Sequence, residues 1–520
     1  MSASREKKKR QELNVAGVTK NTEPVTQKTP VWKVAVYWLI GIAFVVAFVL
    51  VMLFNSSFFA KRSTAVTVGE HKLSPAMVSV YYNSAYNNFY SSYGDYVSYF
   101  FDSSKPLSEQ VYDETTGQSW SDYFMESAKE SMTWAYTLYD QAVQAGMKLT
   151  DEEKASIDEN ISAFKQYATE AGFASIDGYL SAAFGKGVDA KLYREFMEVQ
   201  YLASSFYADK VESYSFTEDE KIAYYNDHAE MYDTVSGDYA VLKGTADATI
   251  TTDENGKETI VEPTEEQNAA AMEEARAKAE EMLAGGSDAM DEAEDLRDMV
   301  DYLKSSVSYV LPEEAAEWLF DTARVEGDMK IFENTANVYV VRFAERDNHD
   351  YLARSIRLVQ INAETAKDVL NSAGEKDAAA TEEAQKAFNE VAAQETKKLF
   401  ESWQDGDATE ETFIEMVKAN SDDATSKEND GLIETVLKSD FTDAVSEWLY
   451  DAKRMSGDCK YFTDAGTSCF IIYYVGESAN AQGALAEGDL LTDTYNTWYT
   501  ELAKAYPVTE QSGMRHVTTR

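Results

Sequence analysis

The cysteines and histidines are the side chains of this 520-residue chain best suited to catalysis or metal binding, and there are 2 of the former and 4 of the latter. Cys459 and Cys469 flank a turn between two expected strands, so they are either a cross-strand disulfide or two buried thiols. The chain has no Cys/His metal spacing and no G-x-x-x-x-G-K-[ST], G-x-S-x-G or H-E-x-x-H motif. We therefore expect no metal, no cofactor and no hydrolase-type nucleophile.

The charge of the chain is distributed unevenly. Residues 1–60 hold 8 Lys and Arg against 3 Asp and Glu, a net charge of +5. Because the whole chain has a net charge of −44, residues 61–520 carry −49. A surface this acidic repels nucleic acid, so we exclude nucleic acid as a partner. The charge either keeps the protein soluble or attracts basic unfolded segments or cations.

An uncharged stretch near the N-terminus predicts a membrane helix. Val34–Phe54 is 21 residues long, enough to cross a bilayer, and positive charge is concentrated before it. We expect a basic cytoplasmic tail at 1–30, a transmembrane anchor at 31–56, and the rest of the chain outside the cytoplasm. A cleaved signal peptide is the alternative, but the stretch is long for one and no clear A-x-A site follows it.

Two segments 130 positions apart share one pattern. Residues 317–328 read EWLFDTARVEGD and residues 447–458 read EWLYDAKRMSGD, and each is followed by two apolar runs separated by a polar turn. The pattern predicts a helix that ends at Gly327 or Gly457 and then a β-hairpin. Such similarity indicates that one structural unit occurs twice.

The region before the repeats, 64–235, is predicted to be mostly helical. Ser74 and Pro75 form an N-terminal capping pair, and the helix that follows carries tyrosines and phenylalanines every three or four residues. This aromatic stripe is either packed in a core or exposed for binding peptides.

A dispersed set of residues in this region resembles the N-terminal chaperone domain of SurA/PrsA-type extracytoplasmic foldases. The set is Ala145-Gly146, Thr150, Gly172, Tyr179-Leu180, Phe184-Gly185, Phe216-Thr217-Glu218 and Tyr224-Tyr225. In that family the helical domain precedes parvulin-type (PpiC-type) peptidyl-prolyl isomerase domains. The resemblance thus implies two parvulin-like domains, a degenerate one at 236–347 and a second at 352–478, each a four-stranded sheet wrapped by helices.

The second unit carries the closer match. Residues 406–423 are similar to the second parvulin helix and its Ser-Asp end, and Asp430-Gly431-Leu432 is similar to the Gly-Gly-x-Leu-Gly turn with one glycine lost. Parvulins place paired histidines on two strands, but the corresponding positions here are about Tyr239 and Tyr339, and Ile356 or Arg357 and Phe470. We therefore assign no catalytic residue and leave open whether the protein is an isomerase.

What the resemblance still implies is a peptide-binding surface in the second unit. Its expected residues are Met416, Phe441, Phe413, Phe470, Ile356 and Gly431. Met416 and Phe441 are the preferred contacts. The alternative is that these side chains are ordinary core, which is the interpretation we favour for Trp448.

The predicted fold class is α+β, with a single N-terminal transmembrane helix, a mostly helical SurA-N-like chaperone domain and two tandem parvulin-like domains. A helix at 485–508 is expected to pack back on the chaperone domain. The expected function is a membrane-anchored, single-pass folding factor that binds unfolded secreted polypeptides, with weak or absent prolyl isomerase activity. The alternatives are an active isomerase and a non-catalytic envelope scaffold; a homodimer is compatible with either.

Overall fold

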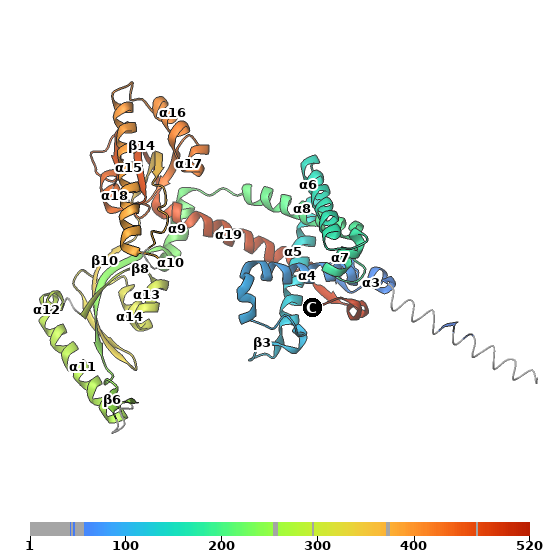
Figure 1. Cartoon of the computed structure of the whole chain (residues 1–520), viewed down its shortest axis with the longest axis horizontal. Helices are drawn as coiled ribbons and strands as arrows, with labels where there is room; N and C mark the ends of the chain where they lie inside the picture. Colours follow the sequence, from blue (N-terminus) through green and yellow to red (C-terminus); the bar gives the residue numbers. More distant parts are fainter. Residues whose placement is uncertain are drawn as a thin grey trace, which may run out of the picture. The chain divides into compact units, whose positions relative to one another are not determined.

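The computed structural model describes Ile42, Val45, Val46 and residues 57–252, 258–293, 296–370, 375–463 and 466–520. These residues form two compact units (Figure 1). The first unit takes in residues up to Glu212 together with Trp498–Arg520, and the second spans Ser213–Thr497. The C-terminal residues therefore belong to the same unit as the N-terminal helices.

The predicted fold class included an N-terminal transmembrane helix, and the structure corrects this part of the prediction. Apart from three residues, its range lies outside the described residues. Among the residues described, no helix combines the length and apolar character that crossing a membrane requires. The fold of the described chain is thus α+β without a membrane-spanning helix.

The first unit is mainly helical. Its helices are α3 (Phe58–Arg62), α4 (Pro75–Tyr93), α5 (Trp120–Gln144), α6 (Asp151–Glu170), α7 (Ile176–Phe184), α8 (Ala190–Glu212) and the end of α19 (Ala481–Ala503), with the 3₁₀ segments η1 (Gly94–Tyr99), η2 (Leu107–Glu109) and η4 (Ser512–His516). Side-chain capping determines where several of these helices begin. The Ser74 side chain accepts a hydrogen bond from the Met77 N–H before α4, and Thr150 and Glu153 form a capping box before α6.

Strands from both ends of the chain meet in this unit. β1 (Val66–Val68) lies between β2 (His71–Leu73) and β15 (Val508–Glu510) in a three-stranded antiparallel sheet. A second small pair, β3 (Val111–Asp113) and β4 (Gln118–Ser119), precedes α5. The main core packs α4 and α5 against β1 and contains the fully buried Tyr82 and Phe124.

The second unit contains two four-stranded antiparallel sheets with the same strand order. The first sheet runs β8 (Arg297–Leu303), β5 (Thr234–Lys243), β10 (Asn337–Asp347), β9 (Met329–Glu333), and the second runs β12 (Leu432–Val436), β11 (Leu352–Asn362), β14 (Ser468–Asn480), β13 (Cys459–Phe462). In both, the first strand in the chain pairs with the second and with the fourth. The repeat seen in the sequence is therefore a repeat of topology.

Helices cover both faces of each sheet. They are α11 (Glu265–Gly285), α12 (Ser287–Glu292), α13 (Lys304–Val310) and α14 (Glu313–Leu319) around the first sheet, and α15 (Ala378–Gln404), α16 (Glu410–Asn420), α17 (Ala424–Glu428) and α18 (Asp443–Leu449) around the second. In the first sheet α11 and α12 pack on one face and α13 and α14 on the other. In the second, α15 and α16 pack on one face and α18 on the other.

Two helices of the second unit lie outside the expected domain boundaries. α9 (Glu218–Asp227) and α10 (Ala229–Tyr232), which we expected in the helical domain, belong here because Tyr225 and Tyr232 are buried against Ala486 at the start of α19. The second unit also contains a separate antiparallel pair, β6 (Thr249–Thr252) with β7 (Glu258–Val261).

The repeated segment forms the same turn twice. The helices α14 and α18 end at Leu319 and Leu449, eight residues before the glycines that we expected to end them. The positive φ of Gly327 (84°) and Gly457 (96°) instead lets the chain turn into β9 and β13. In the second copy the Asp458 carboxylate accepts from the Met455 N–H and from Arg454. The first copy makes the same contacts from its own Asp and Arg. The shared letters therefore encode a structural turn.

Candidate functional site

The six expected binding residues do not line one groove. Ile356 is fully buried, with Phe441 and Phe470 beside it, on the face of the second sheet that α18 covers. Phe413 is fully buried on the opposite face, where α16 also carries Met416. Side chains on opposite faces of a sheet cannot contact the same ligand. The set is therefore divided between two cores.

Only part of this set reaches the surface among the described residues. The rings of Phe441 and Phe470 pack edge to face with centroids 5.5 Å apart, and both are half-buried. Met416 is 9% exposed and lies at the edge of a depression of about 350 Å³ between α15 and α16. These three side chains remain accessible, but from two sides of the domain.

Gly431 is held by its backbone. Its φ is +78°, and a Cβ there would lie 2.7 Å from Val417 Cγ2 and 3.0 Å from the Leu358 carbonyl oxygen. Its N–H donates to the Ser426 carbonyl and its own carbonyl accepts from the Leu358 N–H. The glycine thus permits α17 to turn closely onto β11, which is a structural role.

The two cysteines do not form a disulfide with each other. Cys459 pairs with Tyr473 across the β13–β14 hairpin, and Cys469 lies four residues from Tyr473 along β14. At about 3.3 Å per residue the cysteines are on the order of 13 Å apart, beyond the reach of a disulfide. Cys459 begins β13 and Cys469 is the second residue of β14, and the beginnings of two antiparallel strands lie at opposite ends of a hairpin. Burial raises the pKa of Cys459 to about 12.

None of the four histidines lies on a strand of either four-stranded sheet. His71 is on β2, His228 and His349 lie outside the strands, and His516 is in η4. His349 is buried and its Nδ1 lies 3.1 Å from the Tyr225 hydroxyl oxygen. Within the described chain, no group of three or more His, Cys, Asp or Glu is arranged to hold a metal ion.

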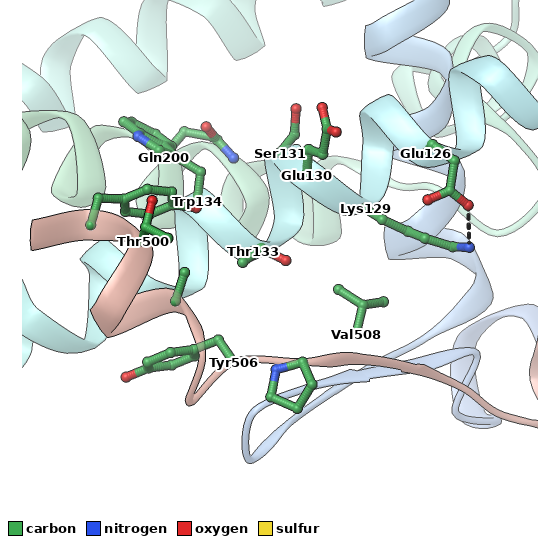
Figure 2. A pocket seen from close by; sticks show the side chains of 13 residues that line it. Glu126, Lys129, Glu130, Ser131, Thr133, Trp134, Gln200, Thr500, Tyr506 and Val508 are labelled. Atoms are coloured by element: carbon green, nitrogen blue, oxygen red, sulfur yellow. Dashed lines mark hydrogen bonds and ion pairs between the residues drawn. The ribbon is translucent and has the colours of Figure 1, made fainter. Parts of the chain in front are cut away.

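A cavity in the first unit has a volume of about 920 Å³, at the upper end of the range for ligand-binding clefts (Figure 2). Its lining residues come from α5, α8, the end of α19 and the segment leading into β15: Glu126, Lys129, Glu130, Ser131, Thr133, Trp134, Gln200, Tyr499, Thr500, Ala503, Tyr506, Pro507 and Val508. We call this cavity the α5–β15 groove.

One wall of the α5–β15 groove is held by ion pairs. Lys129 Nζ lies 2.7 Å from Glu126 Oε1 and 3.0 Å from Glu510 Oε1, so it ties α5 to β15. Burial lowers the pKa of Lys129, but the hydrogen bonds that it donates to Glu126 and Glu510 outweigh this effect and the net pKa is raised. The lysine is therefore charged at neutral pH and fixes the spacing of the two elements.

The opposite end of the α5–β15 groove is fixed by Tyr506. Its hydroxyl donates to Asp140 Oδ2 at 3.0 Å, and the other oxygen of Asp140 lies 2.9 Å from His71 Nε2. Burial and the Asp140 carboxylate raise the pKa of Tyr506 to about 12. The ring also lies against Gly69, where an added Cβ would be 2.9 Å from Tyr506 Cδ1. These contacts position the segment that enters β15.

A second depression of about 390 Å³ continues the α5–β15 groove. The two share Ser131 and Gln200, and the second is bordered by aromatic rings of α4, α5 and α8: Tyr81, Phe89, Tyr93, Tyr123, Phe124 and Phe196. Beyond it lie Tyr96 and Tyr99, 68% and 83% exposed, with their rings stacked. Part of the aromatic stripe is thus buried core and part is an exposed surface.

The arrangement suits binding of an extended chain. Aromatic and apolar groups provide contact area, while hydroxyl, amide and carboxylate groups provide hydrogen bonds. Sequence patterns missed the α5–β15 groove because its walls come from segments 366 residues apart, as the Tyr506–Asp140 contact shows. The sequence feature that could have indicated the α5–β15 groove was the amphipathic helix that ends before Pro507.

No known protein family model matches this chain, and a search of curated proteins gives no match.

Proposed function

We propose that the protein is a folding factor of the SurA/PrsA type that binds unfolded polypeptides through its helical unit, with weak or absent prolyl isomerase activity. The observation that carries the proposal is the α5–β15 groove with its aromatic continuation. Together they offer an elongated surface with dispersed aromatic rings and no fixed chemical centre. Such a surface suits many sequences held weakly.

The repeated sheets support the proposal. Each is a four-stranded sheet with helices on both faces, the architecture that the resemblance to parvulin-type domains implies. The order of the parts also agrees with that resemblance, since helices precede the two sheet domains in the chain. We infer that these domains add binding surface and reach.

The second unit favours binding over catalysis. By the resemblance, the positions that carry histidines in the parvulin family correspond to about Tyr239 and Tyr339 in the first sheet, and to Ile356 or Arg357 and about Phe470 in the second. Tyr239, Tyr339 and Ile356 are buried. General acid–base catalysis at those positions has no titratable imidazole to support it. An isomerase that works through an apolar pocket alone would have to use the half-buried pair Phe441 and Phe470.

The net charge indicates which unfolded polypeptides the protein would bind, and we call these polypeptides its clients. A net charge of −49 over residues 61–520 attracts basic segments and keeps complexes soluble. Among the residues that line the α5–β15 groove, Glu126 and Glu130 outnumber Lys129, which also pairs with Glu510. We therefore propose clients that combine basic and apolar residues.

The proposal places the large acidic part of the chain outside the cytoplasm, as in the family that it resembles. Protease added to intact cells should digest the protein, while a cytoplasmic marker remains intact. Protection of the protein to the same degree as the marker would contradict this location.

The test of function is suppression of aggregation of three unrelated, chemically unfolded proteins. Ser131 is exposed where the two depressions meet, so Ser131→Trp should block both without disturbing the core. Ser162→Trp, at an exposed position on α6, is the matched control. We expect the wild type and the control to suppress aggregation and Ser131→Trp to do so several-fold less well.

Two results would contradict the proposal. Equal suppression by Ser131→Trp and Ser162→Trp would show that the α5–β15 groove is not the binding site. No suppression with any client, together with tight binding to one folded protein, would indicate an envelope scaffold.

A further inference from the structure

The strand β15 has one open edge. In the sheet order β15–β1–β2, β1 covers one side of β15, and among the described strands none pairs with the other side. β15 is only 3 residues long and is preceded by Pro507, so it is a short edge strand of the kind that resists uncontrolled pairing. An open edge still presents backbone N–H and C=O groups in a row.

The register identifies which groups face outward. Val66 is opposite Glu510, Thr67 opposite Thr509 and Val68 opposite Val508. The Gln511 N–H donates to the Ala65 carbonyl at 2.7 Å, so the hydrogen-bonded pairs in this ladder are 65 with 511 and 67 with 509. Because hydrogen-bonded and non-hydrogen-bonded pairs alternate, the N–H and C=O of Val508 and Glu510 point to the open side.

This edge borders the α5–β15 groove. Pro507 and Val508 form one wall, and Thr133 and Lys129 of α5 lie across the open space (Figure 2). The Lys129–Glu510 ion pair holds α5 near the strand. A segment placed in the groove would thus meet peptide groups on one side and the α5 side chains beneath it.

We propose that the α5–β15 groove binds an extended polypeptide as an added β-strand on β15, with basic side chains directed toward α5. This inference rests on the proposed function and specifies how the client is held. Backbone hydrogen bonds to Val508 and Glu510 give affinity that does not depend on client sequence, as in other cases of strand addition. Glu126 and Glu130 on α5 then favour Lys or Arg at the client positions that face them.

The probe is a fluorescent, capped seven-residue peptide that alternates Val and Lys, with binding measured by anisotropy on the full chain at 150 mM salt. Two further forms carry N-methyl groups either on the Val amides or on the Lys amides, which removes donors on one edge of the strand and leaves the charge unchanged. Only one edge of an added strand contacts β15. We expect one methylated form to lose tenfold or more in affinity and the other to stay within about twofold.

A matched pair of variants tests the same edge from the protein side. Val508→Pro removes an outward N–H at the first position of an edge strand, where proline is tolerated. Thr509→Val keeps every backbone donor and is the control. We expect a loss of affinity of about fivefold or more for Val508→Pro and unchanged affinity for Thr509→Val.

The outcomes separate this inference from the proposed function. Equal binding of both methylated forms would overturn strand addition while peptide binding stands. Absence of binding by the unmethylated peptide, together with no suppression of aggregation, would overturn both. The methylated peptides need no variant, so the result does not depend on whether Val508→Pro folds. A stable dimer that the peptide fails to compete with would assign the edge to a second copy and also overturn the inference.

Discussion

The guanidinium carbon of Arg454 lies 4.0 Å from the centroid of the Trp448 ring, and Arg324 repeats the arrangement 5.1 Å from Trp318. Each arginine also binds the Asp that closes its turn. The two copies of the repeated sequence therefore form the same local structure: an aromatic ring, an arginine stacked on it and a carboxylate that caps the next turn.

Replacing Arg454 should destabilise the second unit. Arg454→Ala removes the stacking on Trp448, a hydrogen bond to the Trp448 carbonyl and the pair with Asp458. We expect a loss of about 1–3 kcal/mol in the free energy of unfolding. Arg276→Ala, at an exposed arginine paired with Glu333, is the control and should cost clearly less, because exposed ion pairs contribute little. Equal losses in urea denaturation would contradict the stacking argument.

Replacing Gly431 should be costly for two separable reasons. Gly431→Ala forces a residue with a side chain into a left-handed conformation and brings its Cβ against Val417 and the Leu358 carbonyl. Gly466→Ala has a similar φ of +72° but meets no atom within 4 Å. We expect about 1 kcal/mol for Gly466→Ala and about 2–4 kcal/mol for Gly431→Ala. Chemical denaturation gives both values, and equal losses would exclude the overlap as a cause.

The thiol of Cys459 should make stability fall at alkaline pH. Burial raises its folded-state pKa from 9.0 to about 12, so the stabilising contribution is complete below pH 9 and is lost as the pH rises toward 12. Cys459→Ala should show a shallower decline in unfolding midpoint between pH 9 and pH 11 than the wild type. Burial and then the charges of Glu410 and Cys459 raise the pKa of Tyr473, so the difference between the two profiles reports the thiol together with its effect on that tyrosine. Parallel pH profiles would contradict it.

Prolyl isomerase activity should be weak and independent of Phe441. In a refolding assay limited by proline isomerisation, we expect at most a small acceleration at micromolar protein, because no histidine lies on the sheet strands. Phe441→Ala should leave that rate unchanged. Strong acceleration that Phe441→Ala abolishes would instead establish an isomerase that uses the Phe441–Phe470 pair.

The sequence predicts local structure well where one short segment decides it. Ser74 and Thr150 cap helices as predicted, because each cap depends on a few neighbouring residues. The helices expected to end at Gly327 and Gly457 end at Leu319 and Leu449 instead, so the sequence located the turns but not the helix ends. The repeat also predicted two units of helix, turn and hairpin.

Burial and pairing required the folded chain. Phe413 and Ile356 were grouped by family position, but they lie on opposite faces of one sheet. Cys459 and Cys469 were grouped by proximity in sequence, yet the antiparallel register separates them. The α5–β15 groove depends on the return of the C-terminal segment, for which amphipathicity gives no register.

The C-terminal residues should stabilise the first unit selectively. Thr518 and Arg520 supply hydrogen bonds to Ser79 and Asn83, which are 0% and 2% exposed. Deleting residues 517–520 removes the hydrogen bond that Arg520 donates to Asn83 Oδ1, while Ser79 still donates to Pro75 and Asn83 Nδ2 still donates to Ser79 and Phe184. We therefore expect a total loss of about 1–3 kcal/mol. Arg515→Ala, at an exposed position in η4, is the control.

Hydrogen exchange followed by mass spectrometry can assign the loss to one unit. We expect faster exchange in α4 and α7 after the deletion, because Asn83 also donates to the Phe184 carbonyl at the end of α7 and Arg520 donates to Ala183. Exchange in the two four-stranded sheets should stay at the wild-type rate, since their cores contain none of these residues. Equal acceleration in both units would mean that the chain unfolds as one cooperative body, and the tail would then stabilise the whole protein.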